Sequence, residues 1–369
     1  MRKTYIIIVT LVQMLIYTGV YGLEDSQSGA LSDIILSQAT EGQDHSGHDH
    51  SAHSKHMDHK GHKPMSFPSG YMGGHSHKAN HLMFTYRYMR MSMAGDLLRG
   101  SDAVDVSSVM DYMMVPQEMW MDMHMFGLMY TPMDNLVIMA MLPYIQKEMT
   151  MQSVMMPASL TTNENSGLGD LKVNIGYTLY RIGPHYFHLE LGLGIPTGSI
   201  DAVNPANPMM HLSYPMQLGS GSYELLTGLS YGGHVGSVSW AAQFKGTFRL
   251  NENEYQYKLG NKYQGNAWAG WKFIEYMSVS LRLDLQIQDN ITGSDPMQMA
   301  PTMMPGSDPQ AYGSTVLNGL IGINFYIPLG KVMNKIGVEG GIPLYQSMEG
   351  VKRGSDYVLI VGCSLGYGF

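Results

Sequence analysis

The chain has 369 residues, and only 14% of them are charged, against roughly a quarter in an ordinary soluble domain. Its formal net charge is -8 and it contains no basic block, so nucleic acid is excluded as an expected partner. The single cysteine, Cys363, excludes an intramolecular disulfide framework and any cysteine-based zinc site. Methionine is the unusual residue, with 34 copies, and calls for an explanation.

Residues 1–22 have the pattern of a secretory signal peptide. Arg2 and Lys3 precede a short apolar run, and Val20 and Gly22 stand before a possible cleavage point. A lone membrane anchor is the weaker alternative, because the apolar run is too short to span a bilayer comfortably. Beyond residue 22 no apolar run is long enough for a transmembrane helix, so any membrane-spanning part is not helical.

Residues 23–80 form a segment of different composition, whose histidine-rich part (45–62) has almost no aliphatic side chains. Such a segment cannot offset the entropy of ordering, so we predict a disordered tail. Five of its histidines recur every third residue, a spacing that a polyproline II conformation aligns. Imidazoles in a flexible chain can gather around Cu, Ni or Zn ions; the alternative is a solvated linker with no metal role. The candidate ligands are His45, His48, His50, His53, His56, His59, His62, His75 and His77.

From His81 onward, apolar and polar residues alternate with period two, the pattern of β-strands. The stretch SVSLRLDLQIQ (278–288) is the clearest example. Long connections alternate with short ones such as TPMD (131–134) and YGGH (231–234). Twelve segments are expected to be strands: 81–91, 119–130, 135–145, 169–181, 185–195, 220–230, 235–249, 264–274, 277–289, 314–327, 332–345 and 356–369.

An even number of antiparallel strands, with short turns at one end and long loops at the other, is typical of a bacterial outer-membrane barrel. Closure leaves no unpaired backbone group in lipid. We therefore predict an all-β, membrane-spanning antiparallel barrel over residues 81–369, with lipid around it; a soluble β-sandwich is the alternative. The final strand ends on Phe369, which is similar to the C-terminal signal that outer-membrane barrels present to their assembly machinery, so we expect that machinery as a partner. The residues expected to line the pore are Lys172, Glu190, Lys245, Arg282 and Asp284.

The stretch MWMDMHMF (119–126) places methionines on one face of a strand and polar residues on the other. An aspartate facing hydrocarbon costs on the order of 2–4 kcal/mol or somewhat less, so Asp122 and His124 are expected to face the lumen and the methionines lipid or the outer rim. Asp122 and His124 are then candidate metal ligands within the pore. Loop methionines are candidate ligands for soft Cu(I), or else flexible apolar filler. The loop candidates are Met110, Met113, Met114, Met297, Met299, Met303 and Met304.

The stretches MHMFGLMYTPMDNLVIMAMLPY (123–144), SGLGDLKVNIGYTLY (166–180) and LGLGIPTGSID (191–201) resemble the outer-membrane transporter family named for the meta-pathway of phenol degradation. The resemblance covers most of the chain from His81 to Phe369. It implies a barrel that passes small, often apolar, molecules, broadly like the channels for fatty acids and aromatic hydrocarbons. It supplies no catalytic residues, and no nucleophile pattern is visible, so we do not expect an enzyme.

The expected function is an outer-membrane channel or transporter for small solutes, linked to copper or another transition metal. An even strand count returns both chain ends to the short-turn side, so the tail is expected in the periplasm. There it could exchange ions with periplasmic metal carriers. Two alternatives stay open: a metal-sequestering protein that does not transport, and a channel for hydrophobic or aromatic compounds with no metal role.

Overall fold

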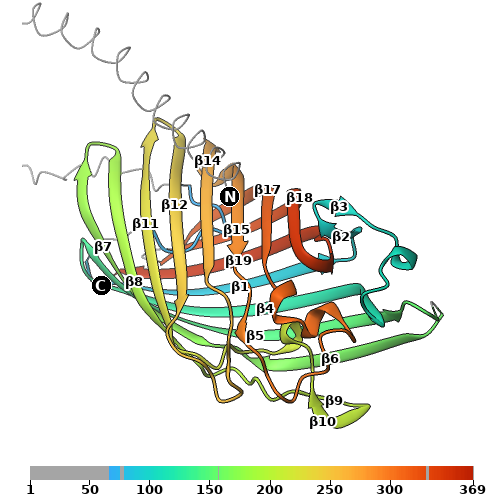
Figure 1. Ribbon diagram of the computed structural model, residues 1–369. Helices are drawn as coiled ribbons and strands as arrows, with labels where there is room; N and C mark the ends of the chain where they lie inside the picture. Colours follow the sequence, from blue (N-terminus) through green and yellow to red (C-terminus); the bar gives the residue numbers. More distant parts are fainter. Residues whose placement is uncertain (1–65, 75–78, 157, 330–331, 369) are drawn as a thin grey trace, which may run out of the picture. The chain divides into compact units, whose positions relative to one another are not determined.

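The computed structural model describes residues 66–74, 79–156, 158–329 and 332–368. Twelve antiparallel strands in it pair in a closed ring, in the order β17-β15-β14-β12-β11-β8-β7-β5-β4-β1-β19-β18, and β18 pairs back onto β17 (Figure 1). This confirms the predicted twelve-stranded barrel. The strands are β1 (His81–Met93), β4 (Met114–Met133), β5 (Leu136–Ser153), β7 (Leu171–Ile182), β8 (His185–Ile195), β11 (Glu224–Val235), β12 (Val238–Arg249), β14 (Lys262–Ile274), β15 (Met277–Gln288), β17 (Ser314–Leu329), β18 (Val332–Arg353) and β19 (Tyr357–Gly368).

Period-two alternation sorts side chains between the outside and the inside of this ring. On β15, Leu281 is 62% exposed while its neighbour Arg282 is 5% exposed, and on β17 Ile321 is 68% exposed. An apolar side chain left open on the outer wall and a charged one buried inside is the reverse of a water-soluble core. This arrangement suits a barrel whose outer band faces hydrocarbon.

Several strands are longer than their sequence pattern indicates. β4 and β5 extend to Met114 and Ser153, and β18 continues to Arg353. The turn expected at YGGH (231–234) lies further on: the strand continues to Val235, and Gly236 makes the turn with φ of +59°. Glycine adopts this left-handed conformation without steric cost, so the chain reverses there.

The long connections hold the remaining short elements. They are β2 (Leu97–Gly100), β3 (Asp102–Ala103), β6 (Leu160–Leu168), β9 (Val203–Asn204), β10 (Asn207–His211), β13 (Tyr257–Lys258), β16 (Thr292–Gly293) and the 3-10 turns η1 (Val106–Ser108), η2 (Tyr214–Met216), η3 (Pro305–Ser307) and η4 (Pro309–Ala311). Among the described residues, no helix is long and apolar enough to cross a membrane.

Residues 66–74 lie inside the barrel, which differs from the prediction that the tail extends to residue 80. Ser66, Ser69 and Tyr71 are buried, and the main chain of this segment bonds to side chains on the inner wall. Its partners on β12, β17 and β18 lie in the half of the barrel nearest the short turns. The segment therefore crosses the lumen at that end, and we call residues 66–74 the lumen segment.

Candidate functional site

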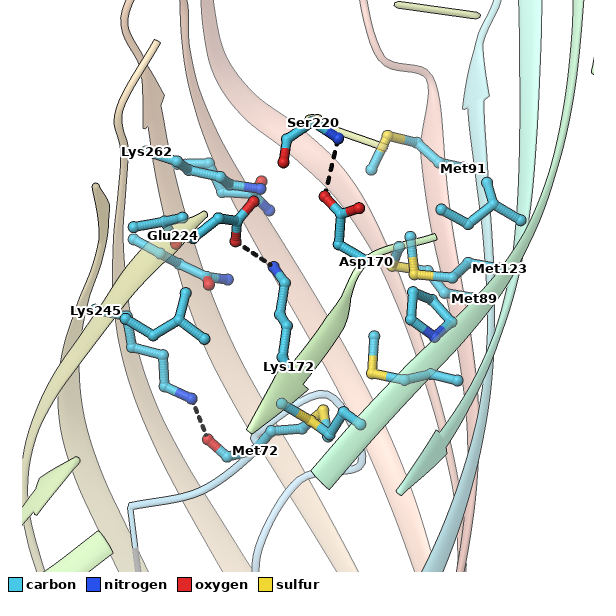
Figure 2. Close-up of a pocket in the computed structure, with 18 of the residues that line it drawn as sticks. Met72, Met89, Met91, Met123, Asp170, Lys172, Ser220, Glu224, Lys245 and Lys262 are labelled. Carbon is cyan, nitrogen blue, oxygen red and sulfur yellow. Dashed lines mark hydrogen bonds and ion pairs between the residues drawn. The ribbon is translucent and has the colours of Figure 1, made fainter. Parts of the chain in front are cut away.

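A cavity of about 470 Å³ lies inside the barrel. Its wall comes from strands on all sides of the ring, its floor includes Gly70 and Met72 of the lumen segment, and its roof includes Tyr214 and Tyr312 of the long loops. Figure 2 shows this interior, with lysines on one side and methionines on the other. The cavity is thus bounded by the loops at one end and by the lumen segment at the other.

Two buried carboxylates and two lysines of the wall hold the floor. Glu339 Oε1 accepts a hydrogen bond from the Gly70 amide at 2.5 Å, and Glu190 accepts one from the Gly74 amide. The Lys245 ammonium donates to the Met72 carbonyl at 2.6 Å, and Lys335 donates to the Phe67 carbonyl. Charge-assisted hydrogen bonds of this kind are stronger than neutral ones, so the barrel wall satisfies the extended backbone of the segment.

An aromatic cluster adds apolar packing to these hydrogen bonds. Phe67 and Tyr71 are stacked with their ring centroids 5.9 Å apart, and each meets the edge of Trp268 at 5.5 Å. Trp268 is 3% exposed. Rings in these orientations contribute about 0.5–1.5 kcal/mol beyond the area that they bury. The lumen segment is therefore docked by packing as well as by polar contacts, and among the described residues no disulfide ties it to the wall.

The segment can pass close to the wall because it ends in two glycines. Gly73 and Gly74 have φ of +69° and +70°, a region that favours glycine. A β-carbon on Gly73 would collide with the Glu190 carboxylate, and one on Gly74 with the Tyr71 hydroxyl. Backbone conformation and space therefore both require glycine here.

Polar side chains of the barrel anchor the roof. The Lys147 ammonium donates to the carbonyls of Pro215 and Gln217 at 2.8 and 2.6 Å. The two oxygens of Asp170 accept from the amides of Gly198 and Ser220 at 3.0 and 2.9 Å. These bonds hold the connection between β8 and β11 over the cavity.

A second loop joins the roof through a buried pair. His211 Nδ1 lies 2.7 Å from Asp295 Oδ2, and the Asp295 amide donates to the Tyr214 hydroxyl at 3.0 Å.

Burial raises the pKa of the Tyr312 phenol, against the opposing charge of Arg249. The Tyr312 hydroxyl is consequently neutral at physiological pH and offers the cavity a polar but uncharged group.

All five residues expected to line the pore border this cavity: Lys172, Glu190, Lys245, Arg282 and Asp284. Most of their charges are paired. Lys172 lies 3.6 Å from Glu224, and Lys245 lies 3.3 Å from Glu190. Arg282 Nε is 2.9 Å from the buried Glu339, which makes Arg282 a link between the wall and the lumen segment.

The structure places Asp122 and His124 outside the lumen, which corrects our expectation for both. The alternate residues of β4, including Met121 and Met123, line the cavity, so Asp122 and His124 point outward. The cost of an outward aspartate is offset by partners: the Tyr88 hydroxyl donates to Asp122 at 2.7 Å, and Arg90 lies 3.6 Å away. The methionines and the polar residues of this stretch do lie on opposite faces of β4, as predicted. The prediction that the polar face turns toward the lumen was wrong.

His124 also has a partner on the outer wall, since its Nδ1 lies 2.8 Å from the Tyr86 hydroxyl. On the same wall, the Arg90 guanidinium lies 4.7 Å from the centre of the Trp120 ring. Among the described residues, no group of three His, Cys, Asp or Glu side chains is arranged to hold a metal ion. Asp122 and His124 therefore form part of a polar and aromatic rim on the outer wall rather than a pore-side site.

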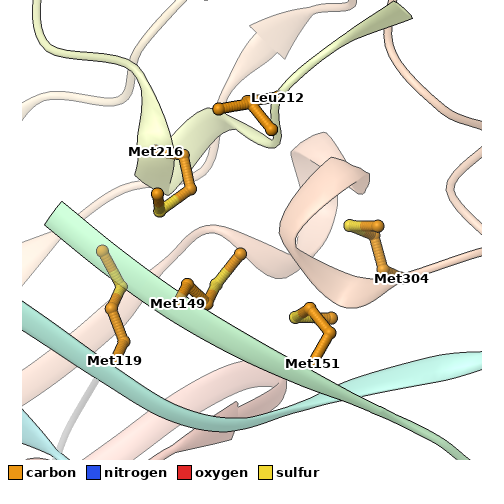
Figure 3. Close-up of a cluster of buried hydrophobic side chains, with 6 residues drawn as sticks. All are labelled: Met119, Met149, Met151, Leu212, Met216 and Met304. Carbon is orange, nitrogen blue, oxygen red and sulfur yellow. The ribbon is translucent and has the colours of Figure 1, made fainter. Parts of the chain in front are cut away.

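Buried methionines gather under the loops, and Figure 3 shows their side chains packed together. The strands contribute Met119, Met149 and Met151, and the loops contribute Met216 and Met304. Met114, which we expected in a loop, lies on β4 and packs against this cluster together with Met299. We call this group, with Leu212, the methionine cluster. Two of the predicted loop ligands, Met299 and Met304, thus meet strand methionines that the sequence pattern did not connect to them.

The other predicted ligands lie elsewhere. Met110 and Met113 are exposed, while Met297 and Met303 are half-buried in the loop before β17. Phe369 lies outside the described residues. So do the histidines predicted as ligands in the tail, which are His45, His48, His50, His53, His56, His59, His62, His75 and His77. Metal binding by these histidines stays a prediction.

Sequence reasoning missed the lumen segment. The stretch SFPSGYMGG (66–74) differs from the histidine-rich part that precedes it, since it has two aromatic residues and three glycines. Aromatic side chains in a segment assigned to a disordered tail could have indicated a docked element. The charged partner Glu339 could not have been recognised, because it lies 269 positions further along the chain.

Comparison with known proteins agrees with this geometry. Residues 114–295 match the family described as "Putative MetA-pathway of phenol degradation". All three stretches that carried the resemblance lie within or border on the matched segment, so the resemblance is confirmed. A search of curated proteins found no match.

The solved structures that resemble this chain include outer membrane proteins. An outer membrane channel from Pseudomonas putida is similar with a TM-score of 0.56 and 10% identity, over 80% of this chain and 98% of that one. The transport unit of the autotransporter AIDA-I from Escherichia coli has a TM-score of 0.41 and 10% identity, over 81% and 94%. A FadL homologue from Pseudomonas aeruginosa has a TM-score of 0.33 and 9% identity, over 78% and 90%. At these identities the likeness to the first establishes the fold alone.

Proposed function

With this family match as the premise, we propose that the chain is a passive channel for small solutes in the bacterial outer membrane. The observation that carries the proposal is the cavity: a closed barrel encloses it, and only non-covalent contacts hold the lumen segment that forms its floor. A solute that enters under the loops can pass once the segment moves. The tail would then lie in the periplasm, at the short-turn end.

Conductance tests this proposal. The full chain, inserted in a planar lipid bilayer in potassium chloride, should give discrete current steps that boiled protein does not give. Migration on a detergent gel before and after boiling should differ, which verifies the closed fold independently. A folded, heat-modifiable barrel that gives no current, even after the lumen segment is weakened by substitution, would contradict a channel function.

The methionine cluster favours a second candidate function, the handling of a soft metal ion. Thioethers are ligands for Cu(I), and five methionines from two strands and two loops are buried together there. The alternative is that these side chains are flexible apolar packing. The cluster would then stabilise the loops without binding an ion.

Silver titration separates these two roles, because Ag(I) is a soft ion that stays in one oxidation state. The full chain should bind Ag(I), and replacement of Met119, Met149 and Met151 by Leu should remove that binding. The matched control replaces Met89, Met121 and Met123 of the cavity wall by Leu. Equal binding by both variants would remove the cluster from any metal function. Copper and nickel binding by a chain lacking residues 44–63 tests the tail histidines separately.

A further inference from the structure

The inner wall of the cavity is divided into two arcs of opposite character. Four neighbouring strands, β19, β1, β4 and β5, form a largely apolar arc. Arg87 of β1 and Lys147 of β5 are its two charged side chains. Its centre consists of methionines, of which Met89, Met91 and Met123 are visible in Figure 2. The others are Met121, Met125 and Met141. The apolar arc is therefore rich in thioethers that face the lumen rather than lipid.

The wall from β7 to β15 forms a charged arc. Over the whole cavity, seven lysine or arginine side chains line the wall with four carboxylates, and Glu339 adds a fifth carboxylate as the partner of Arg282. Other groups already occupy the carboxylates. Glu224 pairs with Lys172 and Arg249, and Asp170 accepts two loop amides. Asp284 accepts from the amides of Gln264 and Gln286 at 2.8 and 2.6 Å. A positive potential consequently remains in the cavity.

Lys262, Arg87 and Lys147 line the cavity without any described carboxylate in ion-pair contact, and of these only Lys262 lies on the charged arc. Lys262 lines the cavity from β14 and, among the described residues, neither a carboxylate within ion-pair distance nor a hydrogen-bond acceptor meets its ammonium group. Lys172 and Lys245, on the same arc, already have carboxylate partners. Figure 2 shows Lys262 on the lysine side of the cavity, across from Met89 and Met91. A negatively charged group near Lys262 would therefore have an apolar surface opposite it.

From this juxtaposition we infer that the solute of the channel is an organic anion with an apolar body, an inference that rests on the proposed channel function. The anionic group lies against Lys262, and the aliphatic or aromatic body lies on the methionines. Methionine is flexible and polarisable, so the apolar arc can accept bodies of different shapes. A cation would be repelled by the charged arc, and an inorganic anion would gain nothing from the thioethers.

Three organic ions that differ in apolar body or in sign of charge test this inference. Benzenesulfonate has an apolar body and a permanent negative charge, methanesulfonate lacks the body, and phenyltrimethylammonium reverses the charge. Permeability ratios are measured from reversal potentials of the full chain in planar bilayers under bi-ionic conditions. Benzenesulfonate should exceed phenyltrimethylammonium by about tenfold, as one unpaired charge in a partly desolvated site can produce. It should also slow its own passage by binding, seen as current block that methanesulfonate does not cause.

Two variants test the role of Lys262 in anion preference and the role of the methionines in binding the apolar body. Lys262→Gln should lower the anion preference severalfold, whereas Lys258→Gln, which changes a loop lysine of β13 outside the cavity, should leave it unchanged. Met123→Gln should weaken block by benzenesulfonate and leave the methanesulfonate current as it was. Each variant is first checked for heat-modifiable migration, so that misfolded protein is recognised.

The outcomes separate the inference from the function on which it rests. Current with equal permeability for the anion and the cation, or block that is indifferent to Met123→Gln, would overturn the organic-anion inference while the channel stands. A folded barrel without current for any of the three salts, even after the lumen segment is weakened by substitution, would overturn the channel, and the inference with it.

Discussion

The amide nitrogen of Gly70 lies 2.5 Å from Oε1 of Glu339, a carboxylate on the inner wall of β18. The other oxygen of the same carboxylate lies 2.9 Å from Arg282 Nε on β15. One buried carboxylate therefore joins the lumen segment to a cation of the wall. Charge pairing and docking of the segment are coupled at this point, which makes the segment a built part of the barrel interior.

Replacement of Tyr71 by alanine should open the channel. Tyr71 is 5% exposed and packs against Phe67 and Trp268, and loss of a buried aromatic side chain typically costs about 3–5 kcal/mol. This free-energy loss weakens docking of the lumen segment and not the barrel itself, because the hydrogen bonds between the barrel strands are unchanged. Mean conductance in planar bilayers should rise. Tyr223→Ala, at a tyrosine that is 50% exposed, is the control and should leave conductance as it was.

Replacement of Gly74 by alanine should also release the lumen segment. The new β-carbon meets the Tyr71 hydroxyl, and the positive φ adds strain. Gly183→Ala is a matched control, since Gly183 has φ of +56° with open space around it. Release is measured as maleimide labelling of Ser69→Cys in a Cys363→Ser background, because Ser69 is buried in the docked segment. Equal labelling in both variants would show that the clash at position 74 does not release the lumen segment.

The methionine cluster should tolerate a change of shape better than a loss of volume. Met151 is 1% exposed, so Met151→Ala should destabilise the packing of the loops by about 2–5 kcal/mol. Met151→Leu keeps the volume and should cost less than about 1.5 kcal/mol. Limited proteolysis of the loop around η2 reports the difference. Similar cleavage of the two variants would show that this cluster does not hold the loop.

Removal of the Asp122 carboxylate should leave ion selectivity unchanged, because Asp122 points away from the lumen. Asp122→Ala also breaks a partly exposed pair with Arg90, a contact of the kind that contributes about 0–1 kcal/mol. By contrast, Asp284→Ala removes a carboxylate from the cavity wall and should increase the preference for anions. Reversal potentials in a salt gradient distinguish the two. A shift with Asp122→Ala as large as that with Asp284→Ala would place Asp122 in the pore after all.

Much of the candidate site could be predicted because period two sends alternate residues to opposite faces. The pattern around Arg282 and Asp284 placed both on the face opposite Leu281 and Leu283, and both border the cavity. The same rule separated Met121 from Asp122, but it does not say which face is inner. That choice depended on Tyr88 and Arg90 of the neighbouring strand, whose register with β4 is a tertiary property.

The sequence by itself determined the twelve strands and their antiparallel order, because alternation and turn chemistry are local. Only the tertiary structure decided the two ends of the cavity. Gly70 and Glu339 are separated by 269 positions, and Met304 of the loop before β17 joins Met149 of β5 in the methionine cluster. Closure of the ring brings such residues together, and no local pattern encodes a contact whose partner is chosen by the whole barrel.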